Sequence, residues 1–376
     1  MRIELPAKEN VYRQNKGWLV SLHLDGWLLL GILTLTAIGS MVVYSASGGD
    51  LEILSKHLLR VTFAFGLMVF VAQIPPNILM VYTPWVFMLG ALMLVAVLLF
   101  GDFGKGAKRW LDLGVFRFQP SEILKLALPM MLAWLFSHET LPPSTRKMLA
   151  GLTLVAFTSG LIIVQPDLGT SILIAMSGLF VLFFAGLSWR FIFTATALVA
   201  ASLPIIWHFY MYEYQKQRVL TFFNPESDPL GTGYHIIQSK IAIGSGGLEG
   251  KGFMGSTQAH LDFLPESTTD FIFSVLAEEF GLFGVAILLL LYLFVIARGL
   301  YIASRAQDNF ARLTAASLIM TLFVYVFVNI GMVSGLLPVV GLPLPLMSYG
   351  GTSLVTLMIS FGILMSIHTH KRLLTS

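Results

Sequence analysis

The sequence predicts an all-α integral membrane protein with about ten transmembrane helices, and three observations support this fold class. Of the 376 residues, 56% are hydrophobic and only 11% are charged, whereas soluble domains carry roughly 25% charged residues. The mean hydropathy is +0.81, and the apolar residues form long runs without the alternation of a membrane β-barrel. Because backbone polar groups find no water in lipid, apolar runs of about 20 residues are expected to be helices.

The composition also excludes several other classes of protein. The chain has no cysteine, which excludes disulfide scaffolds, thiol catalysis and zinc–thiolate sites. A formal net charge of +3, with no run of more than two basic residues, gives nucleic acid little to bind. The 29 Phe, 17 Met and 7 Trp residues are far more apolar surface than a disordered chain carries.

Ten apolar runs are long enough to cross the hydrocarbon core of a membrane as helices. They predict a single polytopic membrane domain over residues 1–376. The runs lie near residues 24–45, 58–74, 77–100, 120–137, 149–165, 168–187, 190–209, 270–297, 310–334 and 348–368.

The distribution of Lys and Arg predicts the orientation of these spans. The segment before the first span, residues 1–23, carries four basic residues, and Lys and Arg accumulate on the cytoplasmic side of membranes. We therefore predict that segment 1–23 is cytoplasmic. It is not expected to be a cleaved signal peptide, because a long apolar run and further spans follow it. Ten spans place the carboxyl terminus in the cytoplasm as well.

Two of the predicted outward loops are unusual. Loop 101–119 carries four cations, which opposes the usual charge rule, so it either tolerates translocation or meets anionic substrate groups. The extracytoplasmic loop over residues 210–269, between the seventh and eighth spans, is rich in Gly, Ser, Asp and Pro, and loops this long are usually functional or disordered. Within it, YHIIQSKIAIGSGGL at 234–248 has the apolar spacing of a short amphipathic helix.

Ionisable residues within the spans are costly to bury and are therefore candidates for function. Glu122 and Lys125 lie three residues apart in the fourth span, so they share one helix face. They form either a self-neutralising pair that holds two helices together, or a cation facing a cavity with a carboxylate that holds it in place. Both descriptions can apply at once.

Two aspartates precede spans. Asp167 follows Pro166 at the start of the sixth span, where a carboxylate caps a helix and offsets its macrodipole. Asp270 follows LPESTT and opens the eighth span at the outer boundary, with Thr268 or Thr269 as the cap and Asp270 in the first turn. A carboxylate at the mouth of a water-accessible cavity near cations is suited to act as a general base, although helix capping alone would also explain it.

Other motifs near this span are weaker. Glu278 and Glu279 point about 80° away from Asp270 and nearly opposite to it, so neither is expected to share its site directly. The run GSGGLEGKG at 244–252 resembles a phosphate-binding loop, but Ser245 stands where that motif requires Gly, so a flexible loop is expected. No HExxH or GxSxG motif and no dedicated metal-ligand set is present.

Seven segments together resemble the shape, elongation, division and sporulation (SEDS) family, and in particular its rod-shape-determining branch. The resemblance covers nearly the whole chain from the first span onward. The segments are SASGGD at 45–50, KRWLDLG at 108–114, RFQPSEILK at 117–125, QPDLGTS at 165–171, QRVLTFFNPESDPLGTGYHIIQSKIAIGSGG at 217–247, FLPESTTDFIFSVLAEE at 263–279 and PLPLMSYGGTS at 343–353.

The resemblance implies a ten-helix SEDS fold and peptidoglycan glycosyltransferase activity on lipid II during cell elongation. It also implies a multi-pass location in the bacterial inner membrane, and a class B penicillin-binding protein as the transpeptidase partner. The expected ligands are lipid II, an undecaprenyl-linked glycan strand and membrane lipids, and no nucleic acid.

The resemblance further implies roles for individual residues. Asp270 matches the family's proposed catalytic aspartate, and Glu122 with Lys125 matches its pair within the membrane. The residues expected to bind the substrate diphosphate or to support the cavity are Lys125, Glu122, Arg109, Arg117, Asp167, Arg218 and Lys240.

The expected reaction follows from these roles. Asp270 would accept the proton of the acceptor's 4-hydroxyl, whose oxygen displaces undecaprenyl diphosphate and inverts the α-linked donor to a β-1,4 bond. Because the leaving group is already an acid, no paired general acid is required, unlike in glycoside hydrolysis. Basic side chains would stabilise the negative charge of the diphosphate. Mg²⁺ or Mn²⁺ is an optional cofactor that would add to this charge stabilisation.

Two alternatives from other functional classes stay open. A lipid II flippase or other transporter would also need polar residues within the spans, but on both faces of the membrane. A scaffold that only recruits a partner synthase would leave the Glu122–Lys125 pair and the outward cations with little to do.

Overall fold

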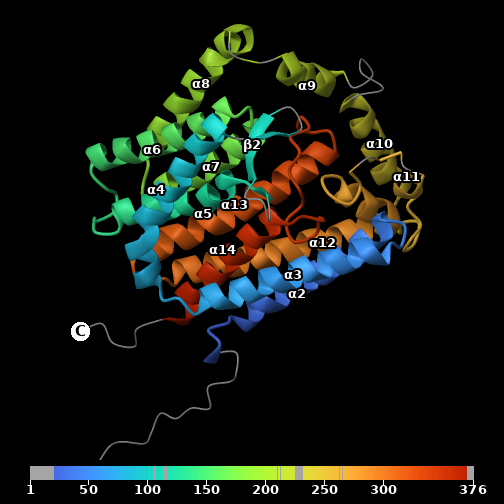
Figure 1. Ribbon diagram of the computed structural model, residues 1–376, viewed down its shortest axis with the longest axis horizontal. Coiled ribbons are helices and arrows are strands. Elements are labelled where there is room, and N and C mark those ends of the chain that lie inside the picture. The colour runs from blue at the N-terminus through green and yellow to red at the C-terminus, as the bar shows by residue number, and fades with distance from the viewer. Residues whose placement is uncertain are drawn as a thin grey trace, which may run out of the picture.

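The computed structural model describes residues 21–100, 102–104, 107–112, 117–209, 211, 213–224, 232–261, 263–264 and 266–370. Most of the predicted cytoplasmic segment 1–23 lies outside these residues. The described chain is a bundle of helices (Figure 1), and each of the ten predicted spans coincides with a helix. These helices are α2 (Gly26–Ala46), α3 (Leu51–Ala72), α4 (Pro76–Phe100), α5 (Pro120–Phe136), α6 (Thr145–Val164), α7 (Leu168–Phe184), α8 (Trp189–Phe209), α12 (Ile272–Ser304), α13 (Asn309–Val333) and α14 (Thr352–Thr369).

Seven of these helices, α2, α3, α4, α6, α12, α13 and α14, are long and apolar enough to cross a membrane. The helices α5 and α7 have 17 residues each, which is about 25 Å at 1.5 Å per residue and shorter than a hydrocarbon core of about 30 Å. The prediction of a multi-pass helical membrane protein is confirmed. The number of crossings and the side on which the termini lie stay predictions.

The first and last helices of the described chain are joined at one end of the bundle. The Nδ1 atom of His23 lies 3.2 Å from Oγ1 of Thr369, near the end of α14. Asp25 caps α2 through the N–H of Leu28 at 2.8 Å, and it also accepts from Arg298 of α12 at 2.5 Å. The beginning of α2 and the ends of α12 and α14 therefore meet at this end.

The loop after α4 contains a small β-sheet that the sequence analysis did not predict. Strands β1 (Asp102–Gly104), β2 (Ala107–Asp112) and β3 (Arg117–Phe118) pair antiparallel in the order β1-β2-β3. Strands β1 and β3 have only three and two residues, and the six residues of β2, AKRWLD, do not alternate between apolar and polar, so sequence patterns do not reveal them. The sheet adds a local feature to an otherwise helical chain.

The described residues of the long loop predicted over 210–269 include three helices. They are α9 (Glu213–Phe223), α10 (Thr232–Ser245) and α11 (Thr257–His260). Helix α10 corresponds to the short amphipathic helix that the sequence predicted, since Ile236, Ser239 and Ala242 are buried and Lys240 is exposed. Figure 1 shows α8 and α9 along one edge of the bundle, away from its centre.

Helices α5 and α13 form the centre of the bundle. Helix α13 packs against α12, α7, α5 and α14, and 72% of its apolar stretch is buried. Helix α5 packs against α4, α7 and α13. Residues on both central helices are therefore shielded from lipid, which is where polar side chains can be kept within a membrane.

Helix α12 is interrupted near its beginning. Gly281 has φ 59° and ψ −159°, a conformation that is essentially restricted to glycine. The loop 246–252 enters this interruption and bonds the backbone groups that it exposes. Four backbone hydrogen bonds of 2.9–3.2 Å join the two segments. In two of them the loop donates, from Lys251 and Gly252 to the carbonyl oxygens of Glu278 and Glu279. In the other two α12 donates, from Leu282 and Phe283 to the carbonyl oxygens of Gly247 and Leu248. Residues 246–252 of the glycine-rich run form a loop, as expected, and these bonds attach it to α12, while Gly244 and Ser245 end α10.

We expect Gly246→Ala to lower the free energy of unfolding by about 1–3 kcal/mol, the usual cost of overpacking. The added Cβ would overlap the carbonyl oxygen of Ala277 in the first part of α12. The stability is measured by heating the purified variant in detergent and following the loss of the monomer peak in size-exclusion chromatography.

The matched control is Gly244→Ala in α10. No atom of the described residues lies within 4 Å of the Cβ added there, and Ala is favoured over Gly within a helix. Equal heat resistance of the two variants would show that loop 246–252 does not need its close approach to α12.

Candidate active site

Asp270 lies in a turn directly before α12, whereas the sequence predicted that it would lie within the first turn of the helix. Helix α12 begins only at Ile272 and has no side-chain cap, so capping does not account for Asp270. The helix starts late because the chain before it forms a turn, in which the N–H groups of Thr269 and Phe271 donate to the carbonyl oxygen of Glu266 at 3.0 and 3.3 Å. Asp270 is only half-buried.

The backbone around Asp270 is held from two directions. Nδ2 of Asn329, in α13, donates to the carbonyl oxygen of Asp270 at 2.9 Å and to that of Leu342 at 2.6 Å. Oγ of Ser348 and the N–H of Tyr349 donate to the carbonyl oxygens of residues 269 and 268, at 2.5 and 2.8 Å respectively. The turn is therefore fixed by α13 and by the segment that precedes α14, without involving the Asp270 carboxylate in these bonds.

A cavity of about 330 Å³ lies beside the segment 337–342. Its walls are mostly apolar and come from the start of α7, from Val219 of α9, from Val328 of α13 and from this segment. The same segment passes Asp270, because a Cβ added to Gly341 would lie 3.4 Å from Oδ2 of Asp270. Asp270 therefore lies against a segment that walls a cavity suited to an apolar chain, although Asp270 is not among the described residues that line the cavity.

Asp167 lines this cavity and is also the N-cap of α7. Its Oδ1 accepts from the N–H of Thr170 at 3.2 Å, as the sequence predicted for a capping aspartate. Its Oδ2 accepts from Nε2 of Gln119 at 3.3 Å. Gly169 lies close to Val340, so Asp167 and Asp270 both border the segment 337–342.

Glu122 and Lys125 form an ion pair on one face of α5, as their spacing predicted. The Oε1–Nζ distance is 2.7 Å, and each side chain is only 7% exposed. The Lys125 ammonium lies 5.3 Å from the ring centroid of Tyr325 in α13, so the pair joins the two central helices. Neither residue is among the described residues that line the 330 Å³ cavity.

The structure describes only some of the basic residues that were predicted to bind the diphosphate. Lys240 is exposed on α10 and its side chain passes close to Gly335, just beyond α13. Arg109 and Arg117 lie on β2 and β3, and Arg218 lies on α9. The side chains of these three arginines are outside the described part of the structure.

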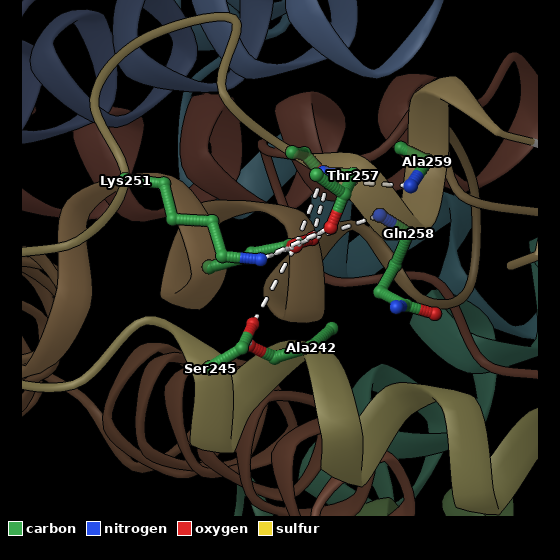
Figure 2. A network of polar contacts seen from close by, with 8 residues as sticks. Ala242, Ser245, Lys251, Thr257, Gln258 and Ala259 are labelled. Atoms are coloured by element: carbon green, nitrogen blue, oxygen red, sulfur yellow. Dashed lines mark hydrogen bonds and ion pairs between the residues drawn. The ribbon is translucent and has the colours of Figure 1, made fainter.

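Glu278 holds a polar network that the sequence analysis did not foresee. It is fully buried and its carboxylate accepts from the side chains of Lys251, Ser256 and Thr257 at 2.6, 2.6 and 2.8 Å. Figure 2 shows the side chains of Lys251, Thr257 and Ser245 converging on this group from loop 246–252, from α11 and from α10 respectively. Two consecutive carboxylates in an apolar run, at 278 and 279, are a sequence signal for a buried polar network. The sequence does not reveal the hydrogen-bond partners, because Ser256 and Thr257 lie about 20 residues before Glu278.

We expect Glu278→Gln to destabilise this region by about 2–5 kcal/mol, as is usual when one partner of a buried charged pair is removed. The Gln amide would turn N–H donors toward groups that are themselves donors. Limited proteolysis between residues 246 and 261 should become faster. Glu249→Gln is the control, since Glu249 is an exposed residue of the same loop, and equal proteolysis of both variants would argue against an anchoring role for Glu278.

Comparison with known proteins identifies the family. A family model of cell cycle proteins, which covers FtsW, RodA and SpoVE, matches residues 18–373. The chain belongs to this family, the SEDS family. A curated SEDS relative, the peptidoglycan glycosyltransferase MrdB of Escherichia coli (strain K12), is 56% identical over 353 residues, which are 94% of this chain and 95% of MrdB. The probable peptidoglycan glycosyltransferase FtsW of Coxiella burnetii is 34% identical over 364 residues, with 93% of this chain and 97% of FtsW covered.

Two solved structures share the SEDS fold with this chain. One comes from a study of the structural coordination of polymerization and crosslinking by a peptidoglycan synthase complex, with a TM-score of 0.79, 31% identity, and 92% of this chain and 97% of that chain covered. The other is the rod shape determining protein RodA of Thermus thermophilus, with a TM-score of 0.69, 27% identity, and 92% and 96% covered. The fold class predicted from the sequence is therefore confirmed.

Proposed function

We propose that this chain is a peptidoglycan glycosyltransferase that polymerises lipid II into β-1,4 glycan strands during cell elongation. The observation that carries the proposal is the position of Asp270. Asn329 donates to its carbonyl oxygen and Ser348 to that of Thr269. The Asp270 carboxylate lies beside the segment 337–342, which walls a largely apolar cavity of about 330 Å³. The 56% identical relative MrdB is named a peptidoglycan glycosyltransferase, and this activity is consistent with the site.

In the proposed reaction, Asp270 is the general base. The 4-hydroxyl of the acceptor sugar gives its proton to the carboxylate, and its oxygen forms a bond to the anomeric carbon of the donor. The bond from that carbon to the diphosphate breaks with its electron pair, and undecaprenyl diphosphate leaves. Attack from the opposite side converts the α-linked donor to a β-1,4 linkage. A half-buried carboxylate on a fixed turn is suited to meet a hydroxyl in a defined direction.

The departing diphosphate needs positive charge close by. Lys125, Lys240, Arg109, Arg117 and Arg218 stay the predicted source of this charge, with Glu122 and Asp167 as supporting carboxylates. The described residues contain no group of three or more His, Asp or Glu side chains that could hold a metal ion. Mg²⁺ or Mn²⁺ therefore stays an optional addition, and no step of the proposed reaction passes through it.

The partner and the location are part of the same proposal. A class B penicillin-binding protein would crosslink the strands that this chain polymerises, in line with the synthase complex in which a structurally similar chain occurs. The chain would lie in the bacterial inner membrane as a single domain. Residues 1–23 would be cytoplasmic, and residues 210–269 would be extracytoplasmic.

The test is polymerisation of purified lipid II by the full chain in complex with its penicillin-binding partner. A penicillin is added to stop crosslinking, and moenomycin to inhibit contaminating polymerases of another class. Long glycan strands are the expected product. A well-folded complex that makes no strands but moves lipid II across liposome membranes would instead establish the flippase alternative.

A further inference from the structure

A cluster of basic and aromatic side chains surrounds Tyr349, in the segment before α14. The guanidinium carbon of Arg60 lies 4.5 Å from the centroid of the Tyr349 ring. The ring of His57 lies 5.9 Å from it, and Lys56 is close enough to the tyrosine to interact with it electrostatically. All three basic residues come from the first turns of α3.

Arg60 has no acidic partner in the described part of the chain. Every ion pair there involves other residues, and Lys56 of the same helix is paired with Glu52 at 2.5 Å. Arg60 lies in a helix long and apolar enough to cross a membrane, where an unpaired charge is costly to keep. A cation held only by an aromatic ring in such a helix is therefore open to an anionic ligand.

His57 gives a second, independent observation. Its side chain is 1% exposed, and neither ring nitrogen has a hydrogen-bond partner among the described residues. Buried polar groups are nearly always hydrogen-bonded, so an orphaned imidazole in the middle of this cluster indicates a group that the protein itself does not supply.

The N-terminus of α14 faces the same region. Its N-cap, Gly351, is two residues after Tyr349, and no side chain caps the helix. The first N–H groups of a helix are positively polarised and favour anions. Apart from Gly351 itself and its two chain neighbours, no described residue has an atom within 4 Å of a Cβ added to Gly351, so a ligand atom has room at this helix end.

The cluster is also tied directly to the candidate base. The N–H of Tyr349 donates to the carbonyl oxygen of Thr268 at 2.8 Å, two residues before Asp270. The neighbouring Ser348 donates to that of Thr269 at 2.5 Å. An anion bound around Tyr349 would therefore contact a segment that is hydrogen-bonded to the two residues directly before Asp270, on the side where α3 and α14 meet.

We infer that Arg60, His57 and the N-terminus of α14 form a second binding subsite for a lipid-linked diphosphate, with Lys56 at its rim. This inference rests on the proposed function, because polymerisation brings two diphosphate-linked substrates to one carboxylate. Arg60 and the α14 N–H groups bind the diphosphate charge, and the His57 imidazole donates to a phosphate oxygen. The Tyr349 ring positions the guanidinium by a cation–π contact. The subsite is separate from the Lys125 pair, which joins α5 and α13.

The test is lipid II binding by the full chain in nanodiscs of phosphatidylcholine, with Asp270→Asn throughout so that bound substrate is not consumed. Two lipid II molecules per chain are expected, counted by native mass spectrometry. Arg60→Gln should lose one of them or bind it about tenfold more weakly or worse, as expected for a lost charge-assisted bond. Arg60→Lys should retain part of the binding. Lys56→Gln, at an exposed position, should weaken it without unfolding the chain.

Arg305→Gln is the matched control. Arg305 also lies over a tyrosine ring, 5.6 Å from the centroid of Tyr301, but at the far end of α12. Unchanged stoichiometry and affinity in both Arg60→Gln and Lys56→Gln would overturn the inference. So would displacement of the second lipid II by equimolar phosphatidylglycerol, because the cluster would then be a site for a bilayer headgroup. If the proposed function itself fails, the unsubstituted complex makes no glycan strands, which is a separate measurement.

Discussion

Asp270→Asn is expected to abolish glycan polymerisation, with a fall in rate of about 10²–10⁴-fold or more. The amide cannot accept the proton of the attacking hydroxyl, although it has nearly the same size as the carboxylate. The bonds that fix the turn go to backbone carbonyl groups, from Asn329 and from residues 348–349. The variant should therefore fold, insert into the membrane and bind its partner normally.

The rate is measured as strand formation from lipid II by the purified complex. Asp50→Asn provides a control with the same chemical change, because Asp50 is an exposed N-cap of α3 and Asn caps helices as well as Asp does. The control should retain full activity. A full yield of polymer from Asp270→Asn would remove Asp270 from the role of base.

Lys125→Met is expected to lower the free energy of unfolding by about 3–5 kcal/mol, because it leaves the Glu122 carboxylate buried without its partner. Both side chains are only 7% exposed and lie between α5 and α13. The double variant Glu122→Gln with Lys125→Met removes both charges and should recover much of the lost stability. Lys147→Met is the surface control, since its pair with Glu139 is 37% and 30% exposed and solvent-exposed ion pairs contribute little to stability.

This comparison separates the two roles that the sequence leaves open for the pair. Heat resistance of the purified chain reports the structural role, and strand formation per folded molecule reports the functional one. If the double variant is stable but inactive, Lys125 supplies charge to the reaction. If the double variant is stable and active, the pair only holds α5 against α13.

The features that were predictable from the sequence are those that depend on nearby residues. Apolar runs of about 20 residues define the helices, and a spacing of three places Glu122 and Lys125 on one face of α5. Asp167 caps α7 within a single turn. Each of these depends on periodicity or on spacing within one turn, which a single sequence displays directly.

The features that were missed depend on contacts between distant segments. Asn329 reaches Asp270 across 59 residues, and Arg60 reaches Tyr349 from a different helix. The helix angle between Asp270 and Glu278 assumed that both lie in α12, whereas the helix begins at Ile272, and it carried no information on the loop that encloses Glu278. The late start of α12 is different, because it results from local backbone bonds of Thr269 and Phe271 to Glu266, which no helix-start pattern encodes. Contacts between distant segments thus decided the first three features, and a local turn decided the fourth.

The interruption at Gly281 has a mechanical consequence for Asp270. The hydrogen bonds of loop 246–252 attach the first part of α12 to the segment 246–269, while the dihedral angles at Gly281 end its alignment with the long part that follows. Two further bonds, from the N–H groups of Leu282 and Phe283, attach the beginning of the long part to the same loop. Loop 246–252 therefore bridges the break at Gly281, and the short helix that starts beside Asp270 is held in a fixed direction relative to the long part of α12.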